Sequence, residues 1–549
     1  MTARLGRTTS PRLPALLAIV VASGMGCGSP PPDRASNAPP VVRSSQVPPA
    51  QPSAVVAVTS PTIAPTAAAP SSKPAAPEST AAESMVSGAA RSVMDRAWEP
   101  IVATDPTDAN SIAVVYQHRG PGTACSLNPT IRISADGGRT WRSTKGHPGA
   151  GSGRGLSLHA AIAWGPGPAG GRRLYWTNMT VPGCAYGAFS LSTSWSDDRG
   201  TTWSKLRVER RTPPWVGGFP EIAVDRNEAS PNYGVVYVAY NWLPPRASAP
   251  GFRLLASPDF GRTWMPLEIP VAKGPRGYPD SWRIGYRLVT APDGSVYASW
   301  YQVDLRRWDR VRIFAKGGAG NVGRLGVAIA RIRFDRSKRT FSVGPSTIAA
   351  TVRETAYTTS GASAPGTAGN IRPDPMWLHG IDVDPQSGRI YLAVAGYGPA
   401  APGASRGTIR VARSDDAGRT WKFTTVPSLP PVNGRRQSSI KPNLVVAAGG
   451  SVVVTFHSLD DTMANATIGN AYAVSTDAGV TWGTPVAVSG VRWRAANLGG
   501  VVNGAGLRER ATRLANGDVY WVYGDGRRAT GAAAGRTVIY GSAIRIRPG

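Results

Sequence analysis

Short runs of alternating or continuous apolar residues recur along the chain after its N-terminal segment. They are rich in Val, Ile and Tyr, and Gly, Pro, Asn or Asp bounds them, which is typical of β-strands. Examples are PEIAVD (220–225), GVVYVAY (234–240), HGIDVD (379–384), GRIYLAVAG (388–396), PNLVVAA (442–448) and SVVVTFHS (451–458). No long stretch carries the 3.6-residue period of an amphipathic helix. The pattern therefore predicts an all-β protein.

One eight-residue motif separates these runs. Its copies are SADGGRTW (134–141), SDDRGTTW (196–203), SPDFGRTW (257–264), SDDAGRTW (414–421) and STDAGVTW (475–482). They recur every 61 or 62 residues, except across one longer interval that holds a degenerate copy, FDRSKRTF (334–341). A fixed period of this size indicates repeated supersecondary units. Each copy follows the third apolar run of its unit, so we expect four strands per unit, with the motif joining the third to the fourth.

The residue types of this octet suit a tight turn. The Asp accepts hydrogen bonds from turn N–H groups, and the Gly tolerates a positive φ. The closing Trp can bury on the order of 150–250 Å² against its own unit. We therefore interpret the octet as a structural device.

The octets resemble the Asp-box, also called the bacterial neuraminidase repeat, and residues 96–549 resemble the sialidase-type β-propeller superfamily. The resemblance implies boxes on the face away from the active site. Six units begin near residues 98, 158, 219, 284, 377 and 440, and a seventh, without a box, covers the last three strands. A ring must close because free strand edges invite aggregation. We expect seven four-stranded blades, with RSVMDRA (91–97) as the outer strand of the last blade; six blades are the alternative.

The N-terminal segment has a different composition. Residues 1–26 combine early arginines with the apolar LPALLAIVVASGMG, which predicts an export signal. SGMGC resembles a bacterial lipobox, which implies lipidation of Cys27; ordinary signal cleavage is the alternative. Residues 27–85 are rich in Pro, Ala and Ser, so we expect a disordered tether before a propeller of residues 86–549. We predict a protein of the cell envelope or outer membrane, otherwise secreted.

The remaining cysteines and the charge bear on compartment and partners. An oxidising compartment permits a disulfide between Cys125 and Cys184; two buried thiols are the alternative. The net charge of +28 favours anionic partners such as acidic glycans, although the basic residues are scattered. Without basic clusters interleaved with aromatics we expect no nucleic-acid partner. No CxxC or HExxH spacing occurs among five histidines, so no metal or cofactor is expected.

The resemblance also suggests where chemistry would lie. Sialidases of known type hold the substrate carboxylate with three arginines and use a Tyr–Glu nucleophile with an Asp acid/base, at the mouth opposite the boxes. By loop position the candidate anion clamp is Arg287, Arg372 and Arg510, and the candidate nucleophile is Tyr523 or Tyr286. The Phe/Tyr-Arg-Ile-Pro signature is absent from the first blade, which opens with RAWEPIVATDP.

Other glycosidases need two carboxylates across a cleft. By loop position the candidates are Glu221, Asp304 and Glu509. The aromatic candidates for stacking on a sugar face are Trp215, Trp282 and Trp377. Tryptophans at strand ends also fill blade cores, so both interpretations stay open for these three residues.

Together these features predict an exported, lipid-anchored, monomeric propeller that acts on carbohydrate. A sialidase-like glycoside hydrolase is one hypothesis, and a non-catalytic propeller that binds glycan or protein is the other. A third is an assembly scaffold of the envelope, since propellers serve many functions. A scaffold would need an exposed apolar patch, whereas an enzyme would need converging acid, nucleophile and arginine groups.

Overall fold

The computed structural model describes most of the predicted propeller. The described residues are 82–86, 96–119, 127–144, 155–182, 190–211, 219–242, 251–268, 281–304, 324–353, 379–398, 406–434, 436–460, 467–494, 508–528 and 537–546. Outside them lie the predicted export signal, the tether up to residue 81, Cys27, Cys125, Cys184, Trp215, Arg372 and Trp377, and of Trp282 and Asp304 only the backbone is described. Among the described residues no helix is long and apolar enough to cross a bilayer.

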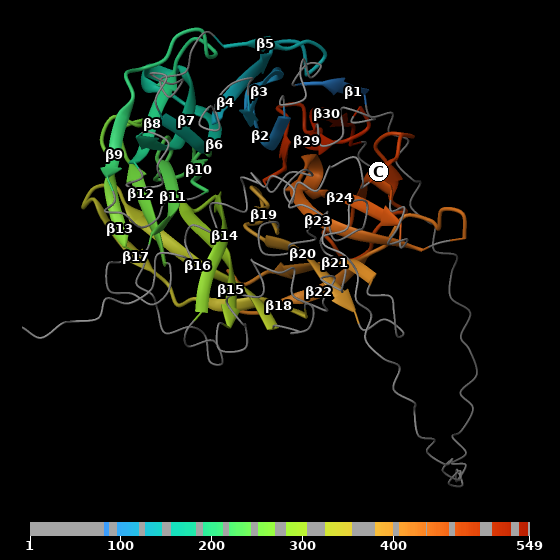
Figure 1. Ribbon diagram of the computed structural model, residues 1–549. Coiled ribbons are helices and arrows are strands. Elements are labelled where there is room, and N and C mark those ends of the chain that lie inside the picture. Colours follow the sequence, from blue (N-terminus) through green and yellow to red (C-terminus); the bar gives the residue numbers. More distant parts are fainter. Residues whose placement is uncertain are drawn as a thin grey trace, which may run out of the picture.

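Seven antiparallel sheets stand side by side around a central axis and form a seven-bladed β-propeller (Figure 1). This arrangement confirms the predicted all-β fold and the prediction of seven blades rather than six. Blade one contains β2 (Arg96–Asp105), β3 (Asp108–Arg119), β4 (Leu127–Ser134) and β5 (Arg142–Ser143); blade two β6 (Gly155–Pro166), β7 (Arg172–Pro182), β8 (Ser190–Ser196) and β9 (Arg207–Arg211); blade three β10 (Glu221–Val224), β11 (Val236–Trp242), β12 (Gly251–Ser257) and β13 (Met265–Glu268).

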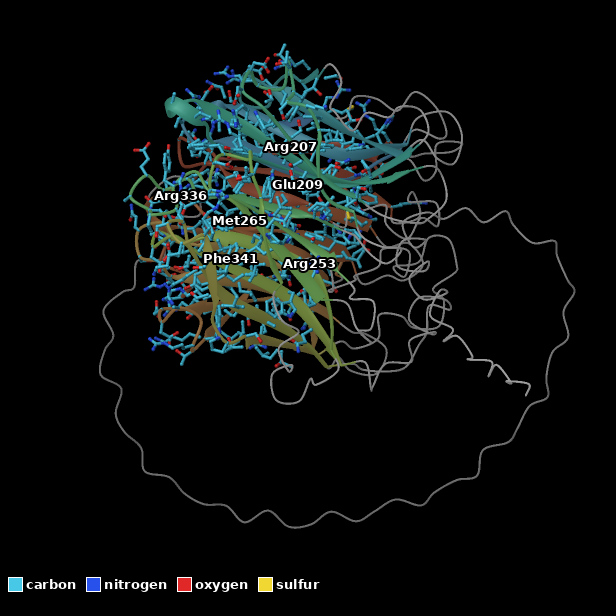
Figure 2. The ribbon with its side chains drawn as sticks, turned by 90° about the vertical axis from the view of Figure 1, so that its left-hand side faces the viewer. Arg207, Glu209, Arg253, Met265, Arg336 and Phe341 are labelled. Carbon is cyan, nitrogen blue, oxygen red and sulfur yellow. The ribbon has the colours of Figure 1, made fainter. Side chains whose placement is uncertain are left out.

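The next three blades repeat this order. Blade four contains β14 (Ser281–Thr290), β15 (Ser295–Asp304), β16 (Arg324–Asp335) and β17 (Thr340–Val343), with β18 (Thr347–Arg353) also paired to β16; blade five β19 (Gly380–Val383), β20 (Ile390–Gly398), β21 (Arg406–Ser414) and β22 (Lys422–Val426); blade six β23 (Gln437–Val446), β24 (Val452–Asp460), β25 (Thr467–Ser475) and β26 (Val486–Ala487), with β27 (Trp493–Arg494) also paired to β25. The view in Figure 2 looks onto the outer strands, where Arg207, Met265 and Phe341 belong to β9, β13 and β17 of successive blades.

Blade seven joins the two ends of the propeller. It contains β28 (Arg510–Arg513), β29 (Val519–Asp525), β30 (Val538–Ile544) and, as its outer strand, β1 (Ala82–Met85). Closure by an N-terminal strand is thus confirmed, but the predicted segment 91–97 is wrong, because its last two residues already belong to β2. The side chains explain the choice: Glu83 binds Arg527 at 2.6 Å, and Ser84 accepts the indole N–H of Trp141 from blade one at 3.2 Å.

The boxes lie between the third and fourth strands, as predicted. In blade one, Ser134 Oγ donates to Asp136 Oδ1 at 2.7 Å and accepts the N–H of Gly138 at 2.8 Å, while Thr140 Oγ1 donates to Asp136 Oδ2 at 2.6 Å. The other four close copies repeat these three bonds. Burial alone would raise the pKa of Asp136, but the hydrogen bonds from Thr140 and Ser134 lower it to about 2.

Adjacent blades bury both faces of their sheets. All nine residues of β24 and all seven of β29 are buried, which is why these strands have nearly continuous apolar sequences. The core between blades one, two and three contains Trp164, Tyr175 and Trp176. Gly380 at the start of β19 lies so close to β23 that a Cβ there would come within 2.5 Å of the backbone nitrogen of Leu444. Tight packing of this kind fixes the first strands of the blades around the axis.

The first strands carry a repeated irregularity that the sequence analysis did not foresee. Glu99, His159, Gly285 and Lys441 have positive φ values between 52° and 66°, and each lies inside a register shift between the first and second strands of its blade. Phe219 (φ 54°) lies two residues before β10 begins, outside any register shift. Such bulges re-aim side chains, and a positive φ at a non-glycine residue costs on the order of 1 kcal/mol. The bulges therefore point to a functional region where the first strands begin.

Candidate functional site

The first strands of all seven blades line a central channel of about 780 Å³. In an antiparallel blade, the turn between strands one and two lies on the same edge as the box between strands three and four. The first strands therefore begin on the opposite face, which we call the front; the box face is the rear. Glu221 and Arg510, the first residues of β10 and β28, line the front part of the channel.

At the front, one carboxylate lies among three arginines. Glu221 Oε1 accepts from Arg287 Nη1 at 3.1 Å and from Arg508 Nη2 at 3.2 Å, and Glu221 Oε2 accepts from Arg510 Nη2. These four residues, called here the Glu221 cluster, come from blades three, four and seven. Glu221, Arg287 and Arg508 are buried, whereas the side chain of Arg510 retains 21% of its exposed area. Arg510 is therefore the member that a ligand reaches first.

Backbone carbonyls hold the two buried arginines in place. Arg508 Nη1 donates to the carbonyl of His159 at 2.9 Å, and Arg508 Nη2 also donates to that of Pro220. Arg287 Nε donates to the carbonyl of His379 at 3.2 Å. These carbonyls belong to the bulge of β6 and to the residues just before β10 and β19, so the front ends of these first strands position the arginines.

A histidine–carboxylate pair lies beside the Glu221 cluster. His159 Nδ1 is 2.9 Å from Glu99 Oε2, and the His159 ring packs on Phe219 with 4.0 Å between ring centroids. The Arg508 guanidinium lies over the Phe219 ring, 5.9 Å from its centroid. Since Glu99 occupies Nδ1, the orientation of the imidazole is set and Nε2 is the nitrogen left for a ligand.

A second histidine lies deeper. His379 is fully buried, with Nε2 2.6 Å from Ser299 Oγ and its ring edge-on to Tyr301 at 5.0 Å. Burial, reinforced by the nearby charge of Arg287, holds the pKa of His379 well below its usual value. His379 is therefore a neutral, structural member of the site at pH 7.

Burial also acts on the arginines. Burial, and then the neighbouring Arg508, lower the pKa of Arg287 to about 9, and burial lowers the pKa values of Arg508 and Arg510 to about 10. All three guanidinium groups are consequently charged at pH 7. Within the described part of the chain, Arg287 Nη2, Arg508 Nε and Arg510 Nε have no hydrogen-bond partner. The three cations thus offer more donors than the Glu221 carboxylate accepts.

Of the candidates named from sequence, the structure brings together Glu221, Arg287 and Arg510. Glu509 lies between Arg508 and Arg510 in the sequence, but its carboxylate is outside the Glu221 cluster. It contacts His457 Nε2 at 2.5 Å and accepts the N–H of Gly524 at 2.9 Å. Tyr523 lies in the second strand of blade seven, fully buried, with its hydroxyl bonded to Glu83 of the outer strand.

The third arginine of the cluster was not assigned to the anion clamp from sequence. Arg508 belongs to the RER triplet that opens blade seven, and a signal was present there, because strand-start positions of other blades also carry charged residues. The described residues contain no group of three or more His, Cys, Asp or Glu side chains that could hold a metal ion.

No model of a known protein family and no curated protein matches the sequence. Among solved structures, the chain is similar to a GH93 α-L-arabinofuranosidase of Fusarium graminearum in complex with arabinobiose, with 10% identity and a TM-score of 0.42 over 85% of this chain and 98% of that chain. It is also similar to a PL25 ulvan lyase, with 12% identity and a TM-score of 0.42 over 81% of this chain and 94% of that chain. A mutant of Trypanosoma rangeli sialidase with trans-sialidase activity matches at 13% identity and a TM-score of 0.30, over 58% of this chain and 45% of that chain. The three names describe enzymes that act on carbohydrates; the likeness to this chain is one of fold.

Proposed function

We propose that this propeller acts on carbohydrate and receives an acidic group of the sugar at the front of its channel, beside Arg510. The observation that carries the proposal is the gathering of three charged arginines around the single carboxylate of Glu221. Counting Glu99 as well, three arginines face two carboxylates. Excess buried charge is costly, so an anionic ligand that supplies the missing charge would bind favourably.

The chemistry of the donors favours a carboxylate or sulfate on the sugar. Guanidinium groups bind planar or tetrahedral oxyanions through paired N–H donors, and Arg510, with 21% of its side chain exposed, is the most accessible of the three cations. His159, oriented by Glu99, is the group that would transfer a proton during cleavage of a glycosidic bond. In this proposal Arg510 binds the acidic group and His159 lies beside the bond that reacts.

A separate observation favours the second candidate, a propeller that binds acidic glycan without cleaving it. Hydrolysis by two carboxylates needs both groups free to face the sugar. Glu221 is held by three arginines and Glu509 by His457 and a backbone N–H. Both carboxylates are therefore engaged in internal contacts.

The full chain tests the proposal with sialyllactose, an oligosaccharide containing glucuronate, and neutral lactose. Calorimetry measures binding, and release of reducing ends measures cleavage. We expect binding of at least one acidic sugar and none of lactose, with affinity lowered at least tenfold by Arg510→Gln. The matched control is Arg419→Gln, which changes an exposed box arginine on the rear face. Equal affinity for acidic and neutral sugars, or an unchanged affinity in Arg510→Gln, would refute the proposal.

Cleavage separates the two candidates. Turnover that His159→Gln abolishes while binding persists would establish an enzyme with His159 in proton transfer. Binding without turnover of any sugar would establish the non-catalytic propeller. An acidic sugar binds in both outcomes, so the role of Arg510 is decided by the binding measurements alone.

Export and lipid anchoring through Cys27 belong to the same proposal and rest on the sequence alone. We expect the wild-type chain to partition into detergent after phase separation, and Cys27→Ser to remain in the aqueous phase. Equal partitioning of the two chains would refute anchoring at this residue. A monomer in solution likewise stays a prediction, which light scattering tests.

A further inference from the structure

The rear of the central channel carries a second group of charges, distant from the Glu221 cluster. Arg226 follows β10, Arg513 ends β28, and Asp382 lies in β19; all three line the channel. Arg226 lies five positions after Glu221 and two beyond the end of β10, so at about 3.3 Å per extended residue it is up to about 16 Å further toward the rear. The three strands involved are the first strands of blades three, five and seven, and all three line the channel.

Neither arginine has a close partner. Over the described residues, the side chains of Arg226 and Arg513 make no hydrogen bond and no ion pair within 4.0 Å, and both residues are open to solvent. Arg172, the first residue of β7, does have a partner, because its guanidinium binds the buried carboxylate of Asp105 at 2.7 Å. Of the described arginines that line the channel, Arg510 binds Glu221, whereas the guanidinium groups of Arg226 and Arg513 have no such partner.

The nearest carboxylate is already engaged elsewhere. Asp382 accepts the backbone N–H of Val446 at 2.8 Å and that of Val383 at 2.9 Å. The two arginines also repel each other: enclosure by the channel walls, and then the charge of Arg513, lower the pKa of Arg226. Asp105 and Asp225 also attract Arg226, and Glu228 lines the same channel. Asp105 binds Arg172, and Asp225 accepts from the Ser230 hydroxyl and the N–H of Asn227, so among the described residues the forked donors of Arg226 and Arg513 stay unoccupied.

We propose that Arg226 and Arg513 form a binding site for one tetrahedral oxyanion, phosphate or sulfate, at the rear of the channel. Forked guanidinium donors suit such an anion, and an anion between them would remove the repulsion. The channel volume of about 780 Å³ is ample for the ion. The site is independent of the sugar site, because no residue is shared between the two.

The test uses the full chain and inorganic phosphate or sulfate, titrated against chloride at constant ionic strength. A ligand that binds the folded chain raises its Tm in a saturable way. We expect saturation in the millimolar range, a tenfold or greater loss of affinity in Arg226→Gln and in Arg513→Gln, and a smaller loss in Arg226→Lys, which keeps the charge and removes the fork. Arg419→Gln should respond as the wild type does.

Phosphate line broadening in ³¹P spectra gives a readout that does not depend on stability. Broadening that disappears in Arg226→Gln would support the site. A wild type without a saturable response, or an Arg226→Gln response equal to that of the wild type, would overturn it. A response that Arg510→Gln abolishes and Arg226→Gln retains would place the ion at the front cluster and would equally overturn the proposal.

Discussion

Replacing Glu221 by Gln removes the one carboxylate that three arginines share. Gln keeps the size but brings an NH2 group toward cations that can only donate hydrogen bonds. Glu221, Arg287 and Arg508 are buried, so their charges have little help from solvent. Removing one member of a buried ion pair costs about 3–5 kcal/mol, because the remaining charge is left uncompensated. We expect a loss of stability at the upper part of that range, since three cations lose their partner.

Urea unfolding followed by tryptophan fluorescence measures this loss. A double-mutant cycle sharpens it: Arg287→Gln should destabilise the wild type, but it should restore stability in the Glu221→Gln chain, because it removes one of three repelling cations. The coupling energy between the two sites should be about 1–3 kcal/mol. A cost below about 1 kcal/mol for Glu221→Gln, or additive effects of the two substitutions, would refute the view that this carboxylate neutralises the cluster.

Three further predictions follow from described contacts. Ser257→Ala removes a buried hydroxyl that links Asp259 to a turn N–H, so it should lower the free energy of unfolding in urea by about 1–3 kcal/mol. Ser337→Ala in the degenerate copy should lower it by about 0.5 kcal/mol or less. Equal losses would contradict a structural role of the box. His379 has a depressed pKa when folded, so below about pH 6.5 the unfolded chain binds a proton that the folded chain does not, and stability should fall by about 1.4 kcal/mol per pH unit toward pH 5. His379→Gln should flatten this pH profile, and an unchanged slope would assign it to other groups. A chain of residues 87–549 lacks β1, so its free energy of unfolding should be about 2–4 kcal/mol lower than that of a chain of residues 74–549. The shorter chain should also aggregate through the open edge of β30. Equal stability of the two chains would show that β1 does not close the ring.

The boxes illustrate what local sequence settles well. The turn geometry at Asp136 is satisfied within eight residues, by Ser134, Gly138 and Thr140, so the same letters give the same turn wherever they occur. Their period then gave the strand order within each blade. The closing strand was harder to assign: Ala82–Met85 has a composition close to that of the preceding tether, and its pairing with β30 depends on partners more than four hundred residues away.

The class of fold, the blade repeat and the rear turns can be predicted from sequence, because each depends on periodicity and on contacts between near neighbours in the chain. The meeting of Glu221 with Arg287 and Arg508 cannot, because these arginines lie 66 and 287 residues after Glu221 and come from other blades. It follows from the folded ring alone. The tertiary structure also decided that Arg226 and Arg513 share the rear of the channel. Residues of different blades meet on the axis only when the ring closes, and the charge balance there is a sum over side chains that no local pattern contains.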